Sequence, residues 1–166
     1  MVKKIVGLGV LLMMIFSLVG CGNKYNAVMY DNAKEWMSEE FLRENLTRGA
    51  FYEDVFLDDN SYPKNITHII KSKEEFDAIF AEFPSEVDFE SSIVFIYIFT
   101  CNSMGSSYKI SKNRLGKNKD LKIYFKRIKP KKLGAYGGGM TSPGQRCFVV
   151  TMNKLDVITV EFVDNE

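Results

Sequence analysis

Seven consecutive apolar residues, 93–99, limit the folds open to this chain more than any other feature of its sequence. Successive side chains of a strand point to opposite faces, so a strand with one solvated face is apolar only at every second position. Here both parities are apolar: Ile93, Phe95, Tyr97 and Phe99 alternate with Val94, Ile96 and Ile98. This pattern is typical of a strand that is covered on both faces. We therefore expect residues 93–99 to form a central strand of a sheet.

Most of the other strand signals lie in the second half of the chain. Residues 121–126 alternate between apolar and polar side chains, which predicts one buried and one solvated face. Shorter strands are predicted at residues 66–70 and 108–110. Residues 147–152 and 157–162 are strand-like and lie four residues apart, a separation suited to a hairpin. The sequence thus indicates a mainly antiparallel sheet.

Two segments in the first half of the chain have helical signals. Ser72 to Glu75 form a capping box, and an apolar stripe with Pro84 behind it predicts a helix over residues 73–83. Residues 32–46 have apolar positions at helical spacing, with Ser38 as the place where this helix could break. We predict an α+β domain in which one or two N-terminal helices pack on a mainly antiparallel sheet of five to six strands.

The N-terminus has the features of a bacterial leader peptide. Lys3 and Lys4 precede an apolar run, residues 5–19, that is short for a bilayer span. The run ends in Leu-Val-Gly-Cys at residues 18–21, which resembles the lipobox of lipoproteins, so we expect lipidation at Cys21. The alternative is an uncleaved anchor with an incidental cysteine. Either version places the rest of the chain on the extracytoplasmic face of the cell membrane.

These features predict the domain organisation. Residues 1–20 would be a cleaved signal peptide, residues 21–30 a lipidated tether, and residues 31–166 a single α+β domain. Two or more acyl chains anchor a protein stably, because a single chain gives only marginal binding. The lipid would therefore hold the domain on the membrane.

Charge is distributed unevenly along the chain. Residues 31–90 contain 16 acidic and 6 basic side chains, whereas residues 91–166 contain 5 acidic and 13 basic ones. One interpretation is an acidic helical layer beside a basic sheet, with solvated or loosely paired charges. The other is a basic patch, from Lys109 to Lys132, for anionic lipid, wall polymer or an acidic partner. Nucleic acid is not an expected partner outside the cell. The candidate residues of this patch are Lys122, Lys126, Arg127, Lys129, Lys131 and Lys132.

After Cys21, two cysteines remain, Cys101 and Cys147, both beside strand-like runs. In an oxidising compartment they could form a disulfide if their strands are neighbours, or they could pack as two small buried side chains. His68 is the only histidine, and the chain contains no Cys-x-x-Cys or His-x-x-x-His spacing. These patterns predict no metal site and no cofactor.

No residue pattern supports catalysis. His68 lies in an apolar run without a Gly-x-Ser-x-Gly nucleophile motif, and the adjacent carboxylate pairs fit solvated helix faces, turns or caps. The glycine-rich segment 137–144 lacks the Gly-Lys-Ser/Thr ending of a phosphate loop. We therefore predict a protein that is not an enzyme.

From residue 66 to the end, the order of motifs resembles the protease-complex subunit PrcB family. The similar pieces are Lys-Ser-Lys-Glu-Glu-Phe at 71–76, Val-Asp-Phe at 87–89, Gly-Ser-Ser-Tyr-Lys-Ile at 105–110 and Thr-Ser-Pro at 141–143. Where that family usually has Ser-Gly-Gly-Tyr-x-Ile, this chain has serines in place of both glycines. The resemblance implies a non-catalytic lipoprotein that binds, stabilises or modulates an exported protein such as a protease. The partner-binding candidates are Ser106, Ser107, Tyr108, Tyr136, Gly138 and Met140.

Overall fold

The computed structural model describes residues 25–31, 33–46, 65–101, 106–128 and 144–165. Several predictions of the sequence fall outside these ranges and stay predictions. They are the leader peptide, the lipidation at Cys21, and any role of Lys129, Lys131, Lys132, Tyr136, Gly138 and Met140. No helix among the described residues is long and apolar enough to cross a membrane.

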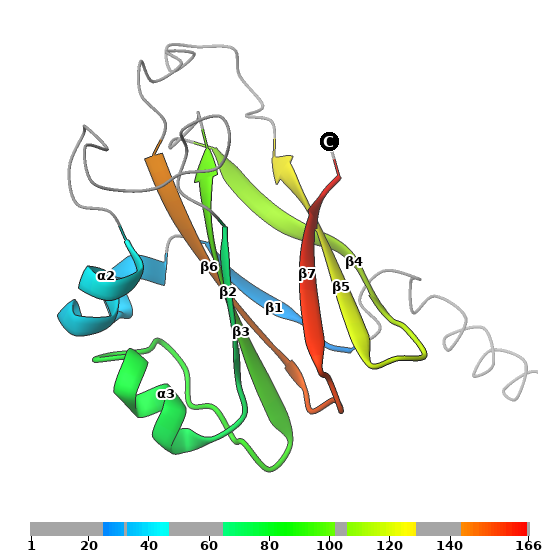
Figure 1. The fold of residues 1–166 in the computed structure, drawn as a ribbon, viewed down its shortest axis with the longest axis horizontal. Helices are drawn as coiled ribbons and strands as arrows, with labels where there is room; N and C mark the ends of the chain where they lie inside the picture. The colour runs from blue at the N-terminus through cyan, green and yellow to red at the C-terminus, as the bar shows by residue number, and fades with distance from the viewer. Residues whose placement is uncertain (1–24, 32, 47–64, 102–105, 129–143, 166) are drawn as a thin grey trace, which may run out of the picture.

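The described strands form two sheets (Figure 1). The first sheet is antiparallel, and its strands in spatial order are β1 (Val28–Asp31), β6 (Gly144–Asn153), β3 (Ser92–Cys101) and β2 (Ile66–Ile70). The second sheet contains β4 (Ser107–Leu115), β5 (Asp120–Ile128) and β7 (Thr159–Asp164). In that sheet β4 is antiparallel to β5, and β7 is parallel to β5.

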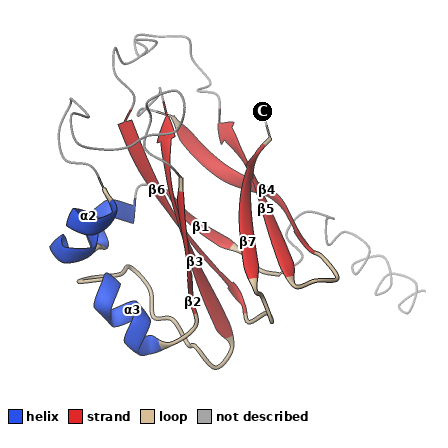
Figure 2. Ribbon diagram, in the orientation of Figure 1, coloured by secondary structure: helices blue, strands red, loops and turns tan. Residues whose placement is uncertain are grey.

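Among the described residues, three short helical segments cover the first sheet on the side away from the second sheet (Figure 2). They are a 3-10 helix, η2 (Ala33–Trp36), and two α-helices, α2 (Glu39–Asn45) and α3 (Lys73–Ile79). The break predicted near Ser38 is confirmed, because Ser38 caps α2 by accepting a hydrogen bond from the Phe41 amide. Together these segments form a third layer, which we call the helical layer.

The serine cap predicted at the start of α3 is also confirmed, and Glu75 reaches back, although to the amide of the residue before the cap and not to that of Ser72. The Ser72 hydroxyl accepts a hydrogen bond from the Glu75 amide at 3.2 Å, and the Glu75 carboxylate accepts one from the Lys71 amide at 2.8 Å. The helix is shorter than predicted and ends before Phe80. The amides of Ala81 and Glu82 donate to the Trp36 carbonyl instead of continuing the helical pattern, so contact with η2 ends α3 early.

The central position predicted for residues 93–99 is confirmed, since β3 lies between β6 and β2 and all seven residues are buried. One parity of β3 packs against the helical layer, and the other packs against the second sheet. The domain is α+β and mainly antiparallel, as predicted. The single sheet of five to six strands is wrong, because a second sheet covers the face of β3 that the helices leave open.

The hairpin predicted between residues 147–152 and 157–162 is also wrong. After β6 the chain crosses to the second sheet, where β7 pairs with β5. Val157 is fully buried in the core between the sheets, and the Ile158 amide donates to the Lys119 carbonyl at 3.0 Å. Burial of Val157 and pairing with β5 therefore direct the last strand away from β6.

The predicted tether, residues 21–30, is longer than the structure allows. Residues 28–31 form the edge strand β1, and Ala27 is already buried. The Asn153 amide donates to the Tyr25 carbonyl at 3.1 Å, and Tyr25 packs against the core between the sheets. Residues 25–30 are therefore already packed on the domain, whereas order was predicted only from near residue 31.

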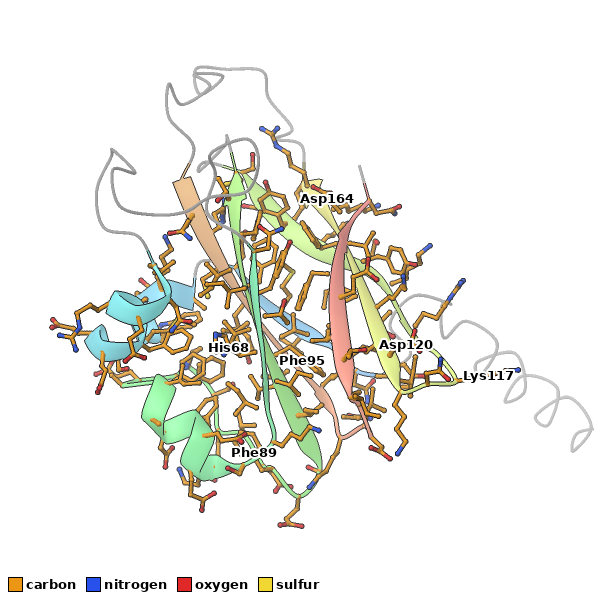
Figure 3. All side chains as sticks on the ribbon, viewed as in Figure 1. His68, Phe89, Phe95, Lys117, Asp120 and Asp164 are labelled. Atoms are coloured by element: carbon orange, nitrogen blue, oxygen red, sulfur yellow. The ribbon has the colours of Figure 1, made fainter. Side chains whose placement is uncertain are left out.

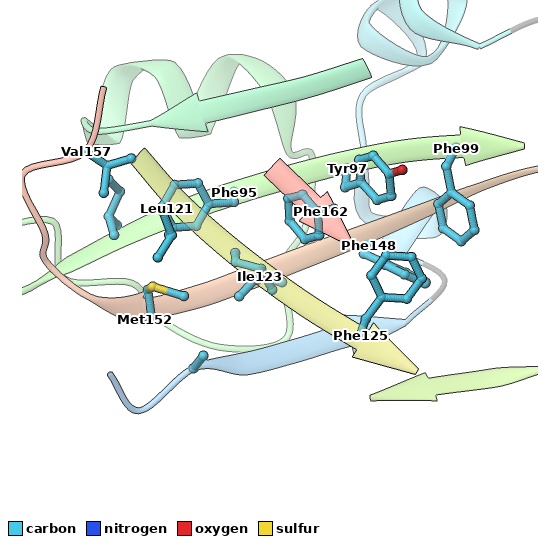
Figure 4. Close-up of a cluster of buried hydrophobic side chains, with 13 residues drawn as sticks. Phe95, Tyr97, Phe99, Leu121, Ile123, Phe125, Phe148, Met152, Val157 and Phe162 are labelled. Carbon is cyan, nitrogen blue, oxygen red and sulfur yellow. The ribbon is translucent and has the colours of Figure 1, made fainter. Parts of the chain in front are cut away.

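The core between the two sheets is rich in aromatic rings (Figure 4). Tyr97 stacks on Phe162 with ring centroids 4.5 Å apart and on Phe99 at 5.1 Å. Its hydroxyl accepts a hydrogen bond from the Asn65 amide nitrogen at 2.9 Å. These contacts hold the phenol in a mostly apolar environment, which favours its neutral form.

Alkaline pH is expected to destabilise the domain through Tyr97. Burial raises the pKa of Tyr97 from 10.0 to about 12, with a smaller contribution from the nearby Asp164. The unfolded chain loses the phenol proton from pH 10 upward and the folded chain does not, so stability falls between pH 10 and 12. Urea unfolding of the wild type and of Tyr97→Phe across this range measures the effect. The prediction would be contradicted if the difference in free energy of unfolding between the wild type and Tyr97→Phe stayed the same across this pH range.

Candidate functional site

The outer face of the second sheet carries a row of basic side chains. On β5, Leu121, Ile123 and Phe125 point inward and are buried, so the residues between them face solvent. The neighbouring strand β4 places further basic residues beside them. The solvent-facing basic residues of these two strands, which we call the basic sheet face, are Lys109, Lys112, Arg114, Lys122 and Lys126.

A β-bulge aligns the basic residues of β4. The register between β4 and β5 shifts between Ile110 and Lys112, and the hydroxyl of Ser111 donates to the Tyr124 carbonyl at 3.1 Å. Without the extra residue, Lys112 would point into the core on the same side as Ile110. The bulge changes which residues of β4 point inward. After it, Asn113 is buried and Lys112 lies on the solvent face.

The pairing across the two strands places like charges directly opposite each other. Lys109 lies opposite Lys126, and Arg114 lies opposite Lys122. Directly opposed like charges destabilise a sheet, so folding gains nothing from these two pairs. Lys112 lies opposite Tyr124, and its ammonium sits 4.3 Å from the centre of that ring.

Little acidic charge balances this face among the residues that the structure describes. Lys122 pairs with Glu161 of β7 at 2.7 Å, and the hydrogen bond that it donates to this carboxylate, together with the negative charge of Glu161, raises the pKa of Lys122. Asp120 occupies the start of β5 on the same face. The five basic side chains therefore share the outer face of the second sheet with two carboxylates, Asp120 of β5 and Glu161 of β7.

The structure places only some residues of the predicted basic patch on the solvent face of the second sheet. Lys122 and Lys126 face solvent as expected. Arg127 is exposed, but it follows the alternation of the inward-facing residues of β5 and lies opposite Tyr108, so it is not on the basic sheet face. Lys112 and Arg114 lie within the predicted span 109–132, but the sequence alone did not assign them to the solvent face, because their outward direction depends on a bulge. The run Ser-Lys-Asn-Arg-Leu at 111–115, which alternates only from residue 112 onward, is the signal that could have indicated it.

The predicted partner-binding turn at residues 106–108 lies mostly in the interior. Ser106 is buried, and Tyr108 packs its ring against Phe148 at 5.3 Å and Phe99 at 5.9 Å. Burial raises the pKa of Tyr108. Among the described candidates for partner binding, only Ser107 is exposed. The resemblance implied that this turn binds a partner. In the structure, Ser106 and Tyr108 instead pack in the interior, where the two sheets meet.

A buried ion pair holds that junction together. The Arg146 guanidinium donates to a carboxylate oxygen of Asp31 and to the Ser106 carbonyl, and it lies over the Tyr108 ring at 5.2 Å. The other oxygen of Asp31 accepts a hydrogen bond from the Tyr108 amide at 3.0 Å. Asp31 and Arg146 belong to strands of the first sheet. Tyr108 belongs to β4 of the second sheet, and Ser106 directly precedes that strand. The cluster therefore holds the two sheets against each other.

The disulfide considered between Cys101 and Cys147 is not formed. Cys147 lies opposite Ile98 and faces the helical layer, whereas Cys101 packs toward the core between the sheets. Two cysteines on opposite faces of a sheet cannot be joined. Burial raises the pKa of the Cys147 thiol to about 12, which keeps it protonated and unreactive.

A pocket of about 340 Å³ lies on the opposite side of the molecule, beside α3. Four phenylalanines line it, and acidic side chains stand at its rim. The lining includes Phe76, Phe80, Phe83 and Phe89, with Asp77, Glu82 and Glu86. We call this feature the aromatic pocket, and Figure 3 shows Phe89 on this side of the fold.

The side chains that could support chemistry do not converge in the described part of the chain. His68 shares a hydrogen bond with the Asn45 side chain at 3.1 Å and contacts the Phe41 ring, and burial lowers its pKa. Within the ranges that the structure describes, no three histidine, cysteine or acidic side chains lie close enough to hold a metal ion. The arrangement of charge on the basic sheet face is therefore the strongest functional feature.

The chain matches no protein-family model, no curated protein and no solved structure.

Proposed function

We propose that this protein is a non-catalytic lipoprotein of the extracytoplasmic face, held by a lipid on Cys21, that binds an anionic partner through the basic sheet face. One observation carries the proposal: two pairs of like charge, Lys109 with Lys126 and Arg114 with Lys122, stand directly opposite on one solvent face. The fold gains no stability from this arrangement. A partner with closely spaced phosphates or carboxylates, such as a wall polymer or a lipid surface, would neutralise it.

Binding to a polyanion tests the proposal. The full chain should bind immobilised polyphosphate at low salt, and the double variant Lys109→Gln/Lys126→Gln should bind about thirtyfold more weakly, since each basic residue near an anionic surface contributes about 1 kcal/mol. Binding should weaken as salt is added, because the Debye length is only about 10 Å at 0.1 M. Removing two opposed ammonium groups should leave the melting temperature unchanged or slightly higher.

A matched control separates this surface from overall charge. Arg43→Gln/Lys73→Gln removes the same two charges from exposed positions of α2 and α3, on the other side of the first sheet. This control should bind polyphosphate like the wild type. Equal weakening by both double variants, or binding that salt does not affect, would reject the basic sheet face as the binding surface.

The aromatic pocket favours a second candidate function, in which the lipoprotein binds and stabilises or modulates an exported protein such as a protease. Phe83 and Phe89 are half-buried at this pocket, so their rings present apolar area to a partner. The pocket and the basic sheet face lie on opposite sides of the domain. Lys109→Gln/Lys126→Gln should therefore leave this second function intact.

A further inference from the structure

The position of β1 relates the basic sheet face to the proposed lipid anchor. Tyr25 packs against the same core as Leu115, the last residue of β4. In Figure 1, β1 starts at the end of the molecule where the turn between β4 and β5 lies, and Figure 3 shows Lys117 and Asp120 at that turn. The chain therefore enters the domain beside the sheet that carries the basic side chains.

The distance available to the anchor is short. Three residues separate Cys21 from Tyr25. A fully extended chain spans at most about 3.6 Å per residue, so four steps cover about 14 Å. The polar headgroup region of one leaflet takes up about 6 Å of this length. A lipid on Cys21 would therefore hold Tyr25 within about one Debye length of the headgroups.

The opposite side of the domain is unfavourable for contact with an anionic surface. The helical layer carries exposed carboxylates on all three of its helical segments and few basic residues. The exposed acids of these segments are Glu35, Glu39, Glu40, Glu44, Glu74, Glu75 and Asp77. Because the helical layer and the basic sheet face lie on opposite sides of the first sheet, the domain has a charge asymmetry across its layers. Anionic lipid attracts one side and repels the other.

From the tether length and this asymmetry we infer that the basic sheet face docks on anionic headgroups of the membrane that anchors the chain. The inference rests on the proposed function and on acylation of Cys21, and it names the anionic partner as lipid. The helical layer and its aromatic pocket then face away from the membrane. In this orientation the lipid covers Lys109, Lys112 and Lys126, whereas Lys73 of α3 stays open to solvent.

Lysine footprinting on vesicles tests the orientation. The full lipidated chain, with its Cys21 lipid verified by intact mass, is reconstituted into phosphatidylcholine vesicles with or without phosphatidylglycerol and treated briefly with an amine-acylating reagent. On phosphatidylglycerol, modification of Lys112 and Lys126 should fall about threefold or more, while Lys73 reacts equally on both vesicles. High salt should remove the protection. In Lys109→Gln/Lys126→Gln, Lys112 should lose its protection, and in Arg43→Gln/Lys73→Gln it should keep it.

Each contrary outcome has a defined meaning. The inference would be overturned if Lys112, like Lys73, reacted equally on vesicles with and without phosphatidylglycerol. A mature chain without lipid on Cys21 would also overturn it. If polyphosphate still binds in the first case, the proposed function stands and only docking on the membrane is rejected. If it still binds in the second case, the basic sheet face remains an anion-binding surface, but the lipid anchor of the proposed function is rejected as well. Protection of Lys112 in intact cells but not on lipid vesicles would assign the surface to a macromolecular partner, which also overturns docking on lipid.

Discussion

Arg146→Met is expected to lower the free energy of unfolding by about 3–5 kcal/mol, measured by urea denaturation. The guanidinium is almost fully buried and donates to Asp31 and to the Ser106 carbonyl. Methionine can fill part of the space of the side chain but cannot donate a hydrogen bond. The substitution would therefore leave the Asp31 carboxylate partly buried without its cation, at the junction of the two sheets.

An exposed ion pair of the same domain provides the control. Lys73 pairs with Asp77 at 2.8 Å, and both side chains are more than half exposed. Lys73→Met should therefore cost less than about 1 kcal/mol. A double variant, Asp31→Asn/Arg146→Met, should recover part of the loss caused by Arg146→Met alone, because it no longer buries an unpaired charge. Equal costs for Arg146→Met and Lys73→Met would show that the buried pair does not hold the sheets together.

The sequence predicted the features of this fold that depend on local patterns. The two apolar parities of β3 indicated a strand covered on both faces, and the alternation in β5 indicated which of its residues face solvent. The Ser72 capping box fixed the start of α3. Each of these features follows from the chemistry of residues close together in the chain, so it can be read without knowledge of the rest of the fold.

The features that sequence analysis missed depend on contacts between distant segments. Four residues between β6 and the predicted last strand suit a hairpin, but β7 pairs with β5 because Val157 fills the core between the sheets. The edge strand β1 is only four residues long and follows a polar stretch typical of a linker. Its pairing with β6 supplies order that its own sequence does not indicate.

The candidate site shows the same division. Lys122 and Lys126 could be predicted from the alternation in β5, since its inward residues are clearly apolar. Lys112 and Arg114 could not, because the bulge near Ser111 reverses which residues of β4 point outward. The opposition of like charges, which carries the functional proposal, is a property of the register between two strands. Register follows from packing of the inner face, so the spacing of the lysines alone does not reveal it.

Phe148→Ala should destabilise the domain about as strongly as Arg146→Met, by about 3–5 kcal/mol. Phe148 is fully buried on β6, and its ring lies 4.7 Å from Phe99 and 5.3 Å from both Tyr108 and Phe125. Its contacts thus include rings from both sheets. The truncation would leave a cavity where the sheets meet, and the surrounding rings can fill it only by moving the sheets relative to each other.

Urea denaturation of Phe148→Ala, Phe148→Leu and Ile158→Ala tests this role. Phe148→Leu keeps most of the buried apolar volume and should cost less than the alanine variant. Ile158 is 64% exposed, so Ile158→Ala should change stability by less than about 0.5 kcal/mol. Phe148 packs against the inner face of β5. A shift of the second sheet in Phe148→Ala should therefore also weaken polyphosphate binding. The binding is compared at urea concentrations at which the wild type stays folded. A loss for Phe148→Ala no larger than that for Ile158→Ala would mean that the two sheets are not held together by this aromatic core, and that the basic sheet face is positioned by β4 and β5 alone.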